Sequence, residues 1–294
     1  MKSAHLNVQS LKVSPRVDVN LLGRRITFMT AETIVAAIAS ACLERKKIIV
    51  ANYNVHSFNL SVQLPWFYSF LQDSDIVHCD GMGILKAARF MGEELPIEYR
   101  ASYTILMPKL LEYCDHNNLS IFLLGSKPKY LQAALVQMRQ QYPNIKVAGH
   151  HGYFQKEDAA QNEAIVQQIN SMKPNILIVG MGMPIQEHWI QQHRDRLDVN
   201  VIMPGGAVID RLAGAVLDCP TVLSNMGLEW LYRLYKEPKR LAVRYLLGNP
   251  AFVLQVLLYR FTTFSANIRN SPASSSSRVD SSSLNDRKSV VSQS

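Results

Sequence analysis

Short hydrophobic runs alternate with longer amphipathic segments along most of the chain. The runs are rich in β-branched and aliphatic residues and end at polar or glycine-rich corners, which is typical of strands buried in a parallel sheet. They predict strands at residues 47–51, 76–79, 119–125, 146–149, 175–179 and 199–203. Apolar residues at helical spacing predict helices at residues 31–43, 56–71 with a break near Pro65, 84–91, 105–117, 128–142, 157–172 and from 185 onward. Residues 19–28 are expected to form a hairpin that turns at Gly23.

This alternation between residues 47 and 214 predicts an α/β fold. We expect residues 1–220 to form a Rossmann-like, mostly parallel sheet with helices on both faces. Residues 221–264 have a helical, basic and aromatic pattern and are expected to form a C-terminal appendage. Residues 265–294 are serine-rich with few apolar side chains, so we expect a disordered tail there.

Half of the excess positive charge falls in the appendage. The formal net charge is +8, and residues 228–264 carry six Lys or Arg against two Glu. This concentration indicates an anionic surface or ligand, such as lipid headgroups or phosphates; a solvated basic helix is the alternative. Trp230, Tyr232 and Tyr235 lie among these cations, as aromatic residues do at membrane interfaces.

Targeting and redox signals favour the cytoplasm. The N-terminus shows no hydrophobic core of signal-peptide length, and no run approaches the about 18 apolar residues of a spanning helix. The four cysteines are widely spaced without a CxxC pair, so free thiols in a reducing compartment are expected. The protein is therefore expected to be cytoplasmic and peripheral on a membrane.

Polar side chains follow two of the predicted strands. Asn52 and Asn54 end one strand, and Asp80 ends the next. Because ligands bind at the carboxyl ends of strands in open α/β sheets, we expect these side chains to line a site. Gly81 and Gly83 would allow the backbone to approach a ligand. A simple Asp-Gly turn is the alternative interpretation of Asp80.

Two later strands also end at glycine-rich corners. Gly180 and Gly182 precede a helix whose first turn carries Gln186, and a glycine turn before a helix N-terminus is suited to a diphosphate. The third glycine and the acidic residue of a dinucleotide fingerprint are missing, so nicotinamide binding is not favoured. Gly206 and Asp210 follow the last strand, and Asp210 either orients a ligand or has a structural role in its loop.

Other candidate motifs are weaker. Asp73 and Asp75 form a DxD pattern, which holds a metal in many sugar transferases, but they precede their strand and fall at the edge of the sheet opposite Asp80. The histidines form no credible metal-ligand set with neighbouring carboxylates. The sequence contains no GxSxG motif and no P-loop.

With these residues placed, the chain resembles the WecG/TagA/CpsF family of bacterial glycosyltransferases (glycosyltransferase family 26) over residues 17–264. The motifs that carry the resemblance are Asn52-x-Asn54, residues 79–83 (CDGMG), Arg100, residues 123–125 (LLG), 180–187 (GMGMPIQE), 210–214 (DRLAG), 227–234 (GLEWLYRL), 237–240 (EPKR) and 244–245 (RY). Because all of them occur in this order, the resemblance is specific.

The resemblance implies an inverting, metal-independent transfer of a sugar from a UDP-sugar, with no cofactor. The implied acceptor is a polyprenyl-diphosphate-linked sugar at the inner face of the cytoplasmic membrane. Asp80 matches the proposed catalytic base of the family, and a carboxylate is suited to take the proton of a weakly nucleophilic hydroxyl. Asn52, where the family usually has threonine, together with Asn54 and Gln186, would contact donor or acceptor.

Four arginines complete the implied site. Arg100 matches a family arginine suited to diphosphate charge. Arg233 and Arg240 match arginines of the appendage, which are thought to close over the site and stabilise the leaving UDP, and we assign Arg244 the same role. Family members often self-associate, so the resemblance leaves a homo-oligomer open.

Two departures from the family pattern affect the substrate. Where the family usually has Gly-x-Asp after the arginine, Arg100 is followed by Ala101, Ser102 and Tyr103, and Asp218-Cys219-Pro220 replaces the usual Arg-Ala-Pro. The first departure lies beside the presumed acceptor pocket. The usual N-acetylmannosamine-type donor and a neutral hexose, as in exopolysaccharide assembly by a hexosyltransferase, therefore both remain open.

Two other classes of function compete with the transferase. The first is a non-catalytic subunit that binds a nucleotide sugar or lipid in a polysaccharide assembly complex; the presence of Asp80, Gln186 and Arg233 favours the enzyme instead. The second, a nucleic-acid binder, rests on net charge alone and has no recognisable motif. We therefore expect no nucleic-acid partner.

Overall fold

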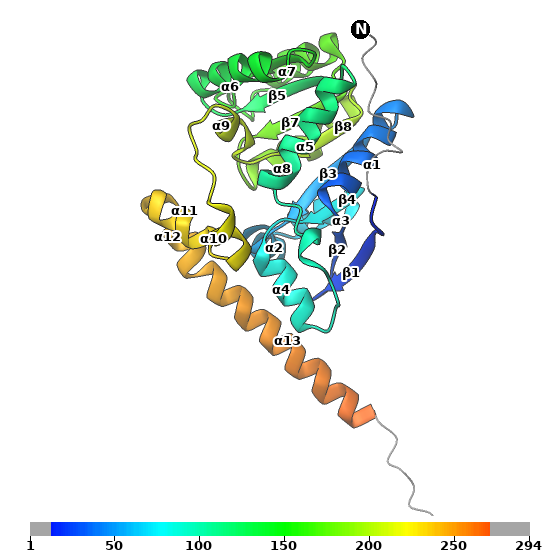
Figure 1. Cartoon of the computed structure of the whole chain (residues 1–294), viewed down its shortest axis with the longest axis vertical. Helices are drawn as coiled ribbons and strands as arrows, with labels where there is room; N and C mark the ends of the chain where they lie inside the picture. Colours follow the sequence, from blue (N-terminus) through cyan, green and yellow to red (C-terminus); the bar gives the residue numbers. More distant parts are fainter. Residues whose placement is uncertain (1–12, 271–294) are drawn as a thin grey trace, which may run out of the picture.

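The structure is a computed structural model that describes residues 13–270 (Figure 1). The strands are β1 Val17–Leu21, β2 Arg24–Phe28, β3 Ile48–Tyr53, β4 Ile76–Cys79, β5 Ser120–Gly125, β6 Lys146–His150, β7 Ile176–Gly180 and β8 Val201–Pro204. The core helices are α1 Ala31–Leu43, α2 Val55–Gln63, α3 Pro65–Asp73, α4 Met82–Phe90, α5 Tyr103–His116, α6 Pro128–Gln141, α7 Ala159–Met172, α8 Ile185–His193 and α9 Val208–Leu212. The appendage contains α10 Thr221–Met226, α11 Glu229–Lys236, α12 Pro238–Leu246 and α13 Gly248–Asn270.

The strands form one sheet in the order β1-β2-β4-β3-β8-β7-β5-β6. The hairpin β1–β2 is antiparallel, and every other pairing is parallel. The predicted α/β class and the mostly parallel sheet are therefore confirmed. Since the parallel strands all point the same way, their carboxyl ends meet at one edge of the sheet.

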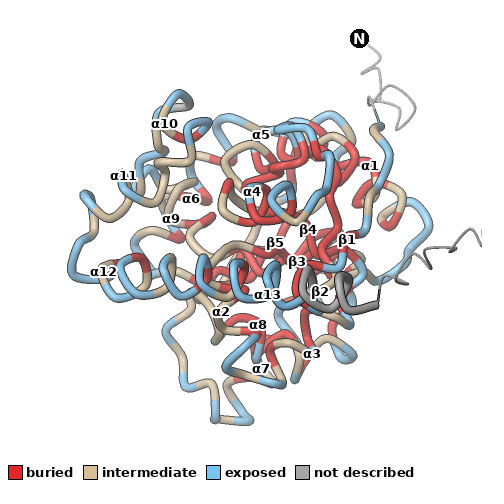
Figure 2. The backbone as a smooth tube through the Cα atoms, turned by 90° about the horizontal axis from the view of Figure 1, so that it is seen from below, coloured by how far each residue is buried: buried red, intermediate tan, exposed pale blue. Residues whose placement is uncertain are grey.

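Alternate residues of the buried strands support two separate cores. In β7, Leu177 and Val179 face the core covered by α2, α3, α4, α7 and α8, whereas Ile176 and Ile178 face the core covered by α1, α5, α6 and α9. Figure 2 shows the buried segments concentrated in and around the sheet. Burial on both faces explains why these strands appear in the sequence as continuous apolar runs.

Local signals account for several of the element boundaries. The Thr30 hydroxyl accepts a hydrogen bond from the backbone N–H of Thr33 at 3.3 Å and begins α1 as an N-cap. Pro65 begins α3, so the expected helix at residues 56–71 is two helices. The Asp75 carboxylate accepts the N–H of Ile49 at 2.8 Å, at the amino edge of the sheet. The structural interpretation of the DxD pattern is therefore favoured.

The last helix, α13, packs across the core before it projects from it (Figure 1). Phe252 is buried with its ring edge-on to Phe58, with 5.0 Å between ring centroids. Asn59 donates a 2.8 Å hydrogen bond to the carbonyl of Gly248. α13 therefore has one face on α2 and another that carries exposed apolar side chains.

Two sequence-based expectations about this region change. The stretch Pro238–Thr262, which includes α12, is long enough to cross a membrane and contains an 18-residue window with a mean hydropathy of 1.5, so it passes by length and composition only. The expectation that no such stretch exists was wrong, because Arg244, Asn249 and Gln255 interrupt the apolar residues without lowering the mean hydropathy of the window below that of a spanning helix. α13 also continues to Asn270, six residues into the predicted disordered tail; the rest of that tail lies outside the described residues.

Candidate active site

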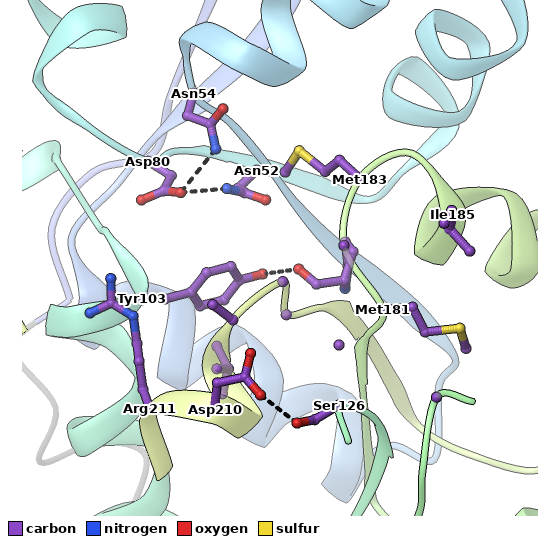
Figure 3. Close-up of a pocket in the computed structure, with 18 of the residues that line it drawn as sticks. Asn52, Asn54, Asp80, Tyr103, Ser126, Met181, Met183, Ile185, Asp210 and Arg211 are labelled. Atoms are coloured by element: carbon purple, nitrogen blue, oxygen red, sulfur yellow. Dashed lines mark hydrogen bonds between the residues drawn. The ribbon is translucent and has the colours of Figure 1, made fainter. Parts of the chain in front are cut away.

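A cavity of about 510 Å³ opens at the carboxyl edge of the sheet (Figure 3). Residues that follow β3, β4, β5, β6, β7 and β8 all contribute to its walls, and the appendage closes one side. The residues predicted from the sequence that line it are Asn52, Asn54, Asp80, Gly180, Gly182, Gly206, Asp210, Arg233, Arg240 and Arg244. The structure thus brings together ten of the twelve predicted site residues, and the two others are described below.

Asp80 is held by the two asparagines that end β3. Asn52 donates a hydrogen bond to Asp80 Oδ2 at 2.7 Å, and Asn54 donates to the same oxygen at 3.3 Å (Figure 3). Within residues 13–270 the other oxygen, Oδ1, accepts no hydrogen bond. One carboxylate oxygen is therefore anchored by two amides, and the other is not.

The environment of Asp80 makes its carboxylate a stronger base. Burial raises the pKa of Asp80 above its ordinary value, while the Asn54 hydrogen bond and the positive charges of Arg233, Arg211 and Arg244 oppose that shift. A base whose pKa lies closer to neutrality removes a hydroxyl proton more effectively, provided that it stays ionised at the working pH.

The corner after Asp80 requires glycine. Gly81 has a φ of 115°, which L side chains rarely adopt. At Gly83 an added Cβ would lie 2.5 Å from Val55 Cγ2, at the start of α2. The CDGMG motif is therefore needed to turn the chain from β4 into α4 while the Asp80 carboxylate faces the cavity.

Gln186 hydrogen-bonds to both glycine corners. Its side-chain Oε1 accepts the N–H of Gly182 at 3.1 Å and the N–H of Gly206 at 3.0 Å, and the residue is fully buried. Because both N–H groups are directed to Gln186, they are turned away from the cavity. The structure thus places Gln186 as a positioning residue beneath the two loops rather than in the cavity wall.

Glu187 lies behind Gln186 and is also buried. Its Oε1 accepts a 2.8 Å hydrogen bond from Gln186 Nε2, and its Oε2 has no hydrogen-bond partner. Burial raises the pKa of Glu187 to about 7, against the opposing Gln186 hydrogen bond. The Glu187 carboxyl group therefore titrates near neutrality. It is the neighbour in sequence of Gln186, which holds the two glycine loops.

Asp210 faces the far end of the cavity. Its carboxylate accepts a hydrogen bond from the hydroxyl of Ser126, which follows β5 (Figure 3). Next to it, Arg211 makes an ion pair with Asp218 and lies 3.8 Å from Glu229 of α11. Asp210 therefore holds a residue that follows β5. Its predicted contact with a ligand stays a prediction.

The three appendage arginines differ in their partners. Arg240 makes a two-point ion pair with Glu237 at 2.6 and 2.9 Å and is exposed. Arg233 and Arg244 make no ion pair with any residue in 13–270, and the Nε of each is buried without a hydrogen-bond partner. Burial lowers the pKa of Arg244. Two guanidinium groups that have no ion pair among the described residues, and whose charges also act on Asp80, provide a place for an anion.

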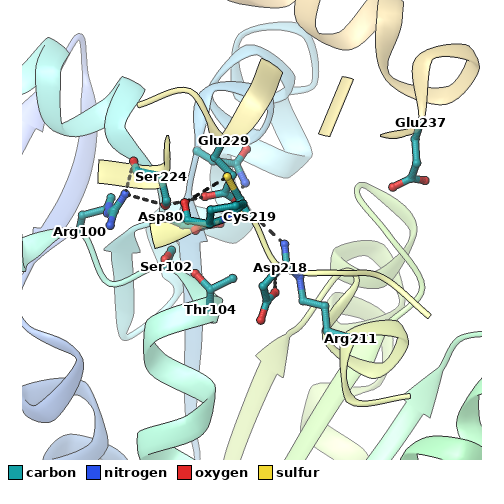
Figure 4. Close-up of polar contacts among 12 residues, drawn as sticks. Asp80, Arg100, Ser102, Thr104, Arg211, Asp218, Cys219, Ser224, Glu229 and Glu237 are labelled. Atoms are coloured by element: carbon teal, nitrogen blue, oxygen red, sulfur yellow. Dashed lines mark hydrogen bonds and ion pairs between the residues drawn. The ribbon is translucent and has the colours of Figure 1, made fainter. Parts of the chain in front are cut away.

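Arg100 is used to hold the appendage. It is buried and donates to the Ser224 carbonyl at 2.6 Å, to the Ser224 hydroxyl at 3.0 Å and to Asn225 Oδ1 at 2.8 Å (Figure 4). The side chain therefore attaches α10 to the core. Its predicted contact with a diphosphate stays a prediction that requires these bonds to be exchanged.

The sequence analysis missed several cavity residues. Tyr103 donates a 2.7 Å hydrogen bond to the Pro204 carbonyl, and the hydroxyls of Ser102 and Thr104 lie 2.8 Å apart beside Asp80. At the other end the walls come from Ser126, Lys127, Tyr130, Tyr153 and Lys156. Ser126 and Lys127 follow β5, so the strand-end argument used for Asp80 could have found them.

Two further sequence expectations concern cysteine and metal. All four cysteines are free thiols, as expected, and Cys79 and Cys114 are buried. In the part of the chain that the structure describes, no group of three or more His, Cys, Asp or Glu side chains is placed to hold a metal ion.

Comparison with known protein families identifies the family of the chain. The model of the "Glycosyl transferase WecG/TagA/CpsF family" matches residues 19–266, and the chain belongs to that family. The protein is therefore a glycosyltransferase that uses a nucleotide sugar.

Curated relatives carry a more specific name. The chain is 31% identical over 194 residues to the N-acetylglucosaminyldiphosphoundecaprenol N-acetyl-beta-D-mannosaminyltransferase of Staphylococcus aureus strain MW2, covering 66% of this chain and 73% of the relative. The protein of the same name from strain MRSA252 shows the same identity and coverage.

Proposed function

We propose that the protein transfers a hexose or N-acetylhexosamine from a UDP-sugar to a polyprenyl-diphosphate-linked sugar, with Asp80 as the general base. The observation that carries the proposal is the Asp80 carboxylate: one oxygen is anchored by two amides, and the other faces a cavity bordered by two unpaired arginines. The names of the relatives supply the acceptor class.

The proposed reaction is a single displacement. The acceptor hydroxyl gives its proton to Asp80 Oδ1 as its oxygen attacks the anomeric carbon from the face opposite the UDP. The bond between that carbon and the diphosphate oxygen breaks, and the configuration inverts. Arg233 and Arg244 balance the charge that develops on the leaving UDP, a role that a metal ion has in other sugar transferases. The proposed reaction is metal-independent.

The sugar specificity is proposed to depend on the hydroxyls beside Asp80. Ser102 and Thr104 line the cavity in the segment where the family usually has a Gly-x-Asp corner, and both can hydrogen-bond a sugar hydroxyl or an acetamido group. The relatives are named for N-acetylmannosamine transfer. A panel of UDP-sugars tested against defined lipid-diphosphate sugars, with the product identified by mass, decides between that sugar and a neutral hexose.

The appendage is proposed to attach the enzyme to the inner face of the cytoplasmic membrane. Exposed apolar residues of α12 and α13, among them Leu246, Leu254 and Leu258, lie near the cations of α11 and α12. Removing residues 218–294 is therefore expected to abolish transfer and vesicle binding together, since the truncation also removes Arg233 and Arg244. A truncated protein that turns over lipid acceptor at the full rate would refute this role.

The alternative of a non-catalytic binding subunit has no specific observation in its favour. It predicts UDP-sugar binding without turnover. An assay of UDP release in the presence of the lipid acceptor separates the two functions, because only an enzyme shows release that depends on the acceptor.

A further inference from the structure

A second cavity, of about 540 Å³, meets the first at Asp80. The two share five lining residues: Asn54, Asp80, Glu229, Arg233 and Arg244. The second cavity leads away from the sheet edge between α4 and the appendage. Its volume falls within the range of about 300–1,000 Å³ that is usual for small-ligand sites.

The walls of this second cavity are mainly apolar. One side is the face of α4, and the other is formed by α11, α12 and the first turns of α13. Its apolar lining residues are Val55, Met82, Ala87, Phe90, Trp230, Tyr245, Phe252, Val253, Val256 and Leu257. His56 adds no charge at neutral pH, since burial and the Arg244 charge lower its pKa to about 4.

Two arginines of the cavity act on Asp80, whose pKa their charges lower, and Lys86 and Arg100 line this cavity but not the first. Arg233 and Arg244 lie at the shared end without ion pairs among residues 13–270, and Lys86 donates only a 3.4 Å hydrogen bond to the Met226 carbonyl. Glu229 is the acidic group there besides Asp80, and it accepts a hydrogen bond from Ser224. The far end, around Val253 and Leu257, joins the exposed apolar face of α13.

We infer that this second cavity binds the isoprenoid chain of the acceptor next to its diphosphate, an inference that rests on the proposed function. A sugar-linked prenyl diphosphate has the same order of chemistry: a sugar at the catalytic carboxylate, a dianionic group near Lys86 and Arg100, which line this cavity and not the first, then a hydrocarbon chain along apolar walls. The chain leaves the cavity where α13 exposes Leu254 and Leu258. The enzyme therefore recognises the hydrocarbon chain of the acceptor as well as its sugar, and acceptor binding does not depend on membrane attachment alone.

Two neighbouring residues of α13 provide a matched test. Val253 lines the cavity and is 53% exposed, whereas Leu254 is 56% exposed and does not line it. The full-length protein and the variants Val253→Asp and Leu254→Asp are titrated with geranylgeranyl diphosphate and with inorganic diphosphate, without membrane or detergent. UDP binding and thermal unfolding report whether each variant is folded.

If the second cavity binds the isoprenoid chain, the wild-type protein should bind geranylgeranyl diphosphate more tightly than inorganic diphosphate. Val253→Asp should reduce that preference by about tenfold, as expected when roughly two methylene groups lose their apolar contacts, and Leu254→Asp should keep it. Equal loss in both variants would indicate a general apolar surface and overturn the inference, as would no loss in either. A failed UDP-sugar panel would reject the proposed function, whereas the diphosphate titration tests the cavity independently.

Discussion

Asn52 donates a 2.7 Å hydrogen bond to Asp80 Oδ2 across two neighbouring parallel strands, β3 and β4. Asn52 is buried, so this bond fixes the carboxylate from inside the sheet. The orientation of the proposed base is thus set by the pairing of β3 with β4 rather than by a loop. A base held by rigid elements needs no reorganisation when the acceptor hydroxyl arrives.

The first prediction concerns the base itself. Asp80→Asn is expected to reduce kcat for transfer by roughly 10²–10⁴, because the amide cannot take the hydroxyl proton. The affinity for UDP should remain mostly intact. Acceptor-dependent UDP release and calorimetric titration with UDP measure the two properties. Asp73→Asn is the matched control, since Asp73 belongs to the other edge of the sheet. If the kcat of D80N equals that of D73N, Asp80 is not the base.

The second prediction separates two roles of Asn54. Its Nδ2 hydrogen-bonds Asp80, while its Oδ1 accepts the Ser57 N–H at 3.0 Å as the N-cap of α2. Loss of the bond to Asp80 destabilises the carboxylate and raises its pKa further. Activity that needs ionised Asp80 is lost as the pH falls, so the acidic limb of kcat/KM should move to higher pH in both Asn54→Ala and Asn54→Ser.

The two Asn54 variants should differ in stability. Serine is a good N-cap, whereas alanine is not, so only Asn54→Ala should lose about 1 kcal/mol of unfolding free energy. The pH profile and chemical denaturation are measured on the same samples. An acidic limb that stays in place in both variants would show that Asn54 does not tune the base.

The third prediction concerns the buried carboxyl of Glu187. Its pKa in the folded protein is about 7, above the ordinary value of 4.5, so the folded state holds a proton that the unfolded chain releases between these pH values. Its contribution to stability is therefore fully present below about pH 4.5 and is lost as the pH rises towards 7. The loss is at most about 3 kcal/mol.

Glu187→Gln removes this titration while it keeps an acceptor for Gln186 Nε2. The difference in unfolding free energy between wild type and variant, measured from pH 4.5 to 8, is expected to shift in favour of the variant as the pH rises. A difference that does not change with pH would mean that Glu187 is ionised in the folded protein across the whole range.

The part of the site that strand ends define could be predicted from the sequence. Asp80, Asn52 and the glycine corners follow short apolar runs, and parallel pairing brings those ends together. The roles of Gln186 and Arg100 could not be predicted, because each depends on which segment folds back onto it: two glycine loops in one case and α10 in the other. The second cavity was missed for the same reason, since its walls come from α4 and α13, which are far apart in the chain.

The last prediction distinguishes the appendage arginines by their partners. Arg233 lines both cavities and has no ion pair among residues 13–270, whereas Arg240 is exposed and paired with Glu237. Arg233→Ala should reduce kcat by roughly 10²–10³, the usual cost of removing one group that stabilises developing charge. Arg240→Ala should reduce kcat by a smaller factor, because the charge of Arg240 is already largely compensated by Glu237. Steady-state kinetics with saturating lipid acceptor measure both losses. If Arg240→Ala lost as much as Arg233→Ala, the Glu237 pair would have to open during turnover, and Glu237→Gln, which frees Arg240, would then raise rather than lower the rate.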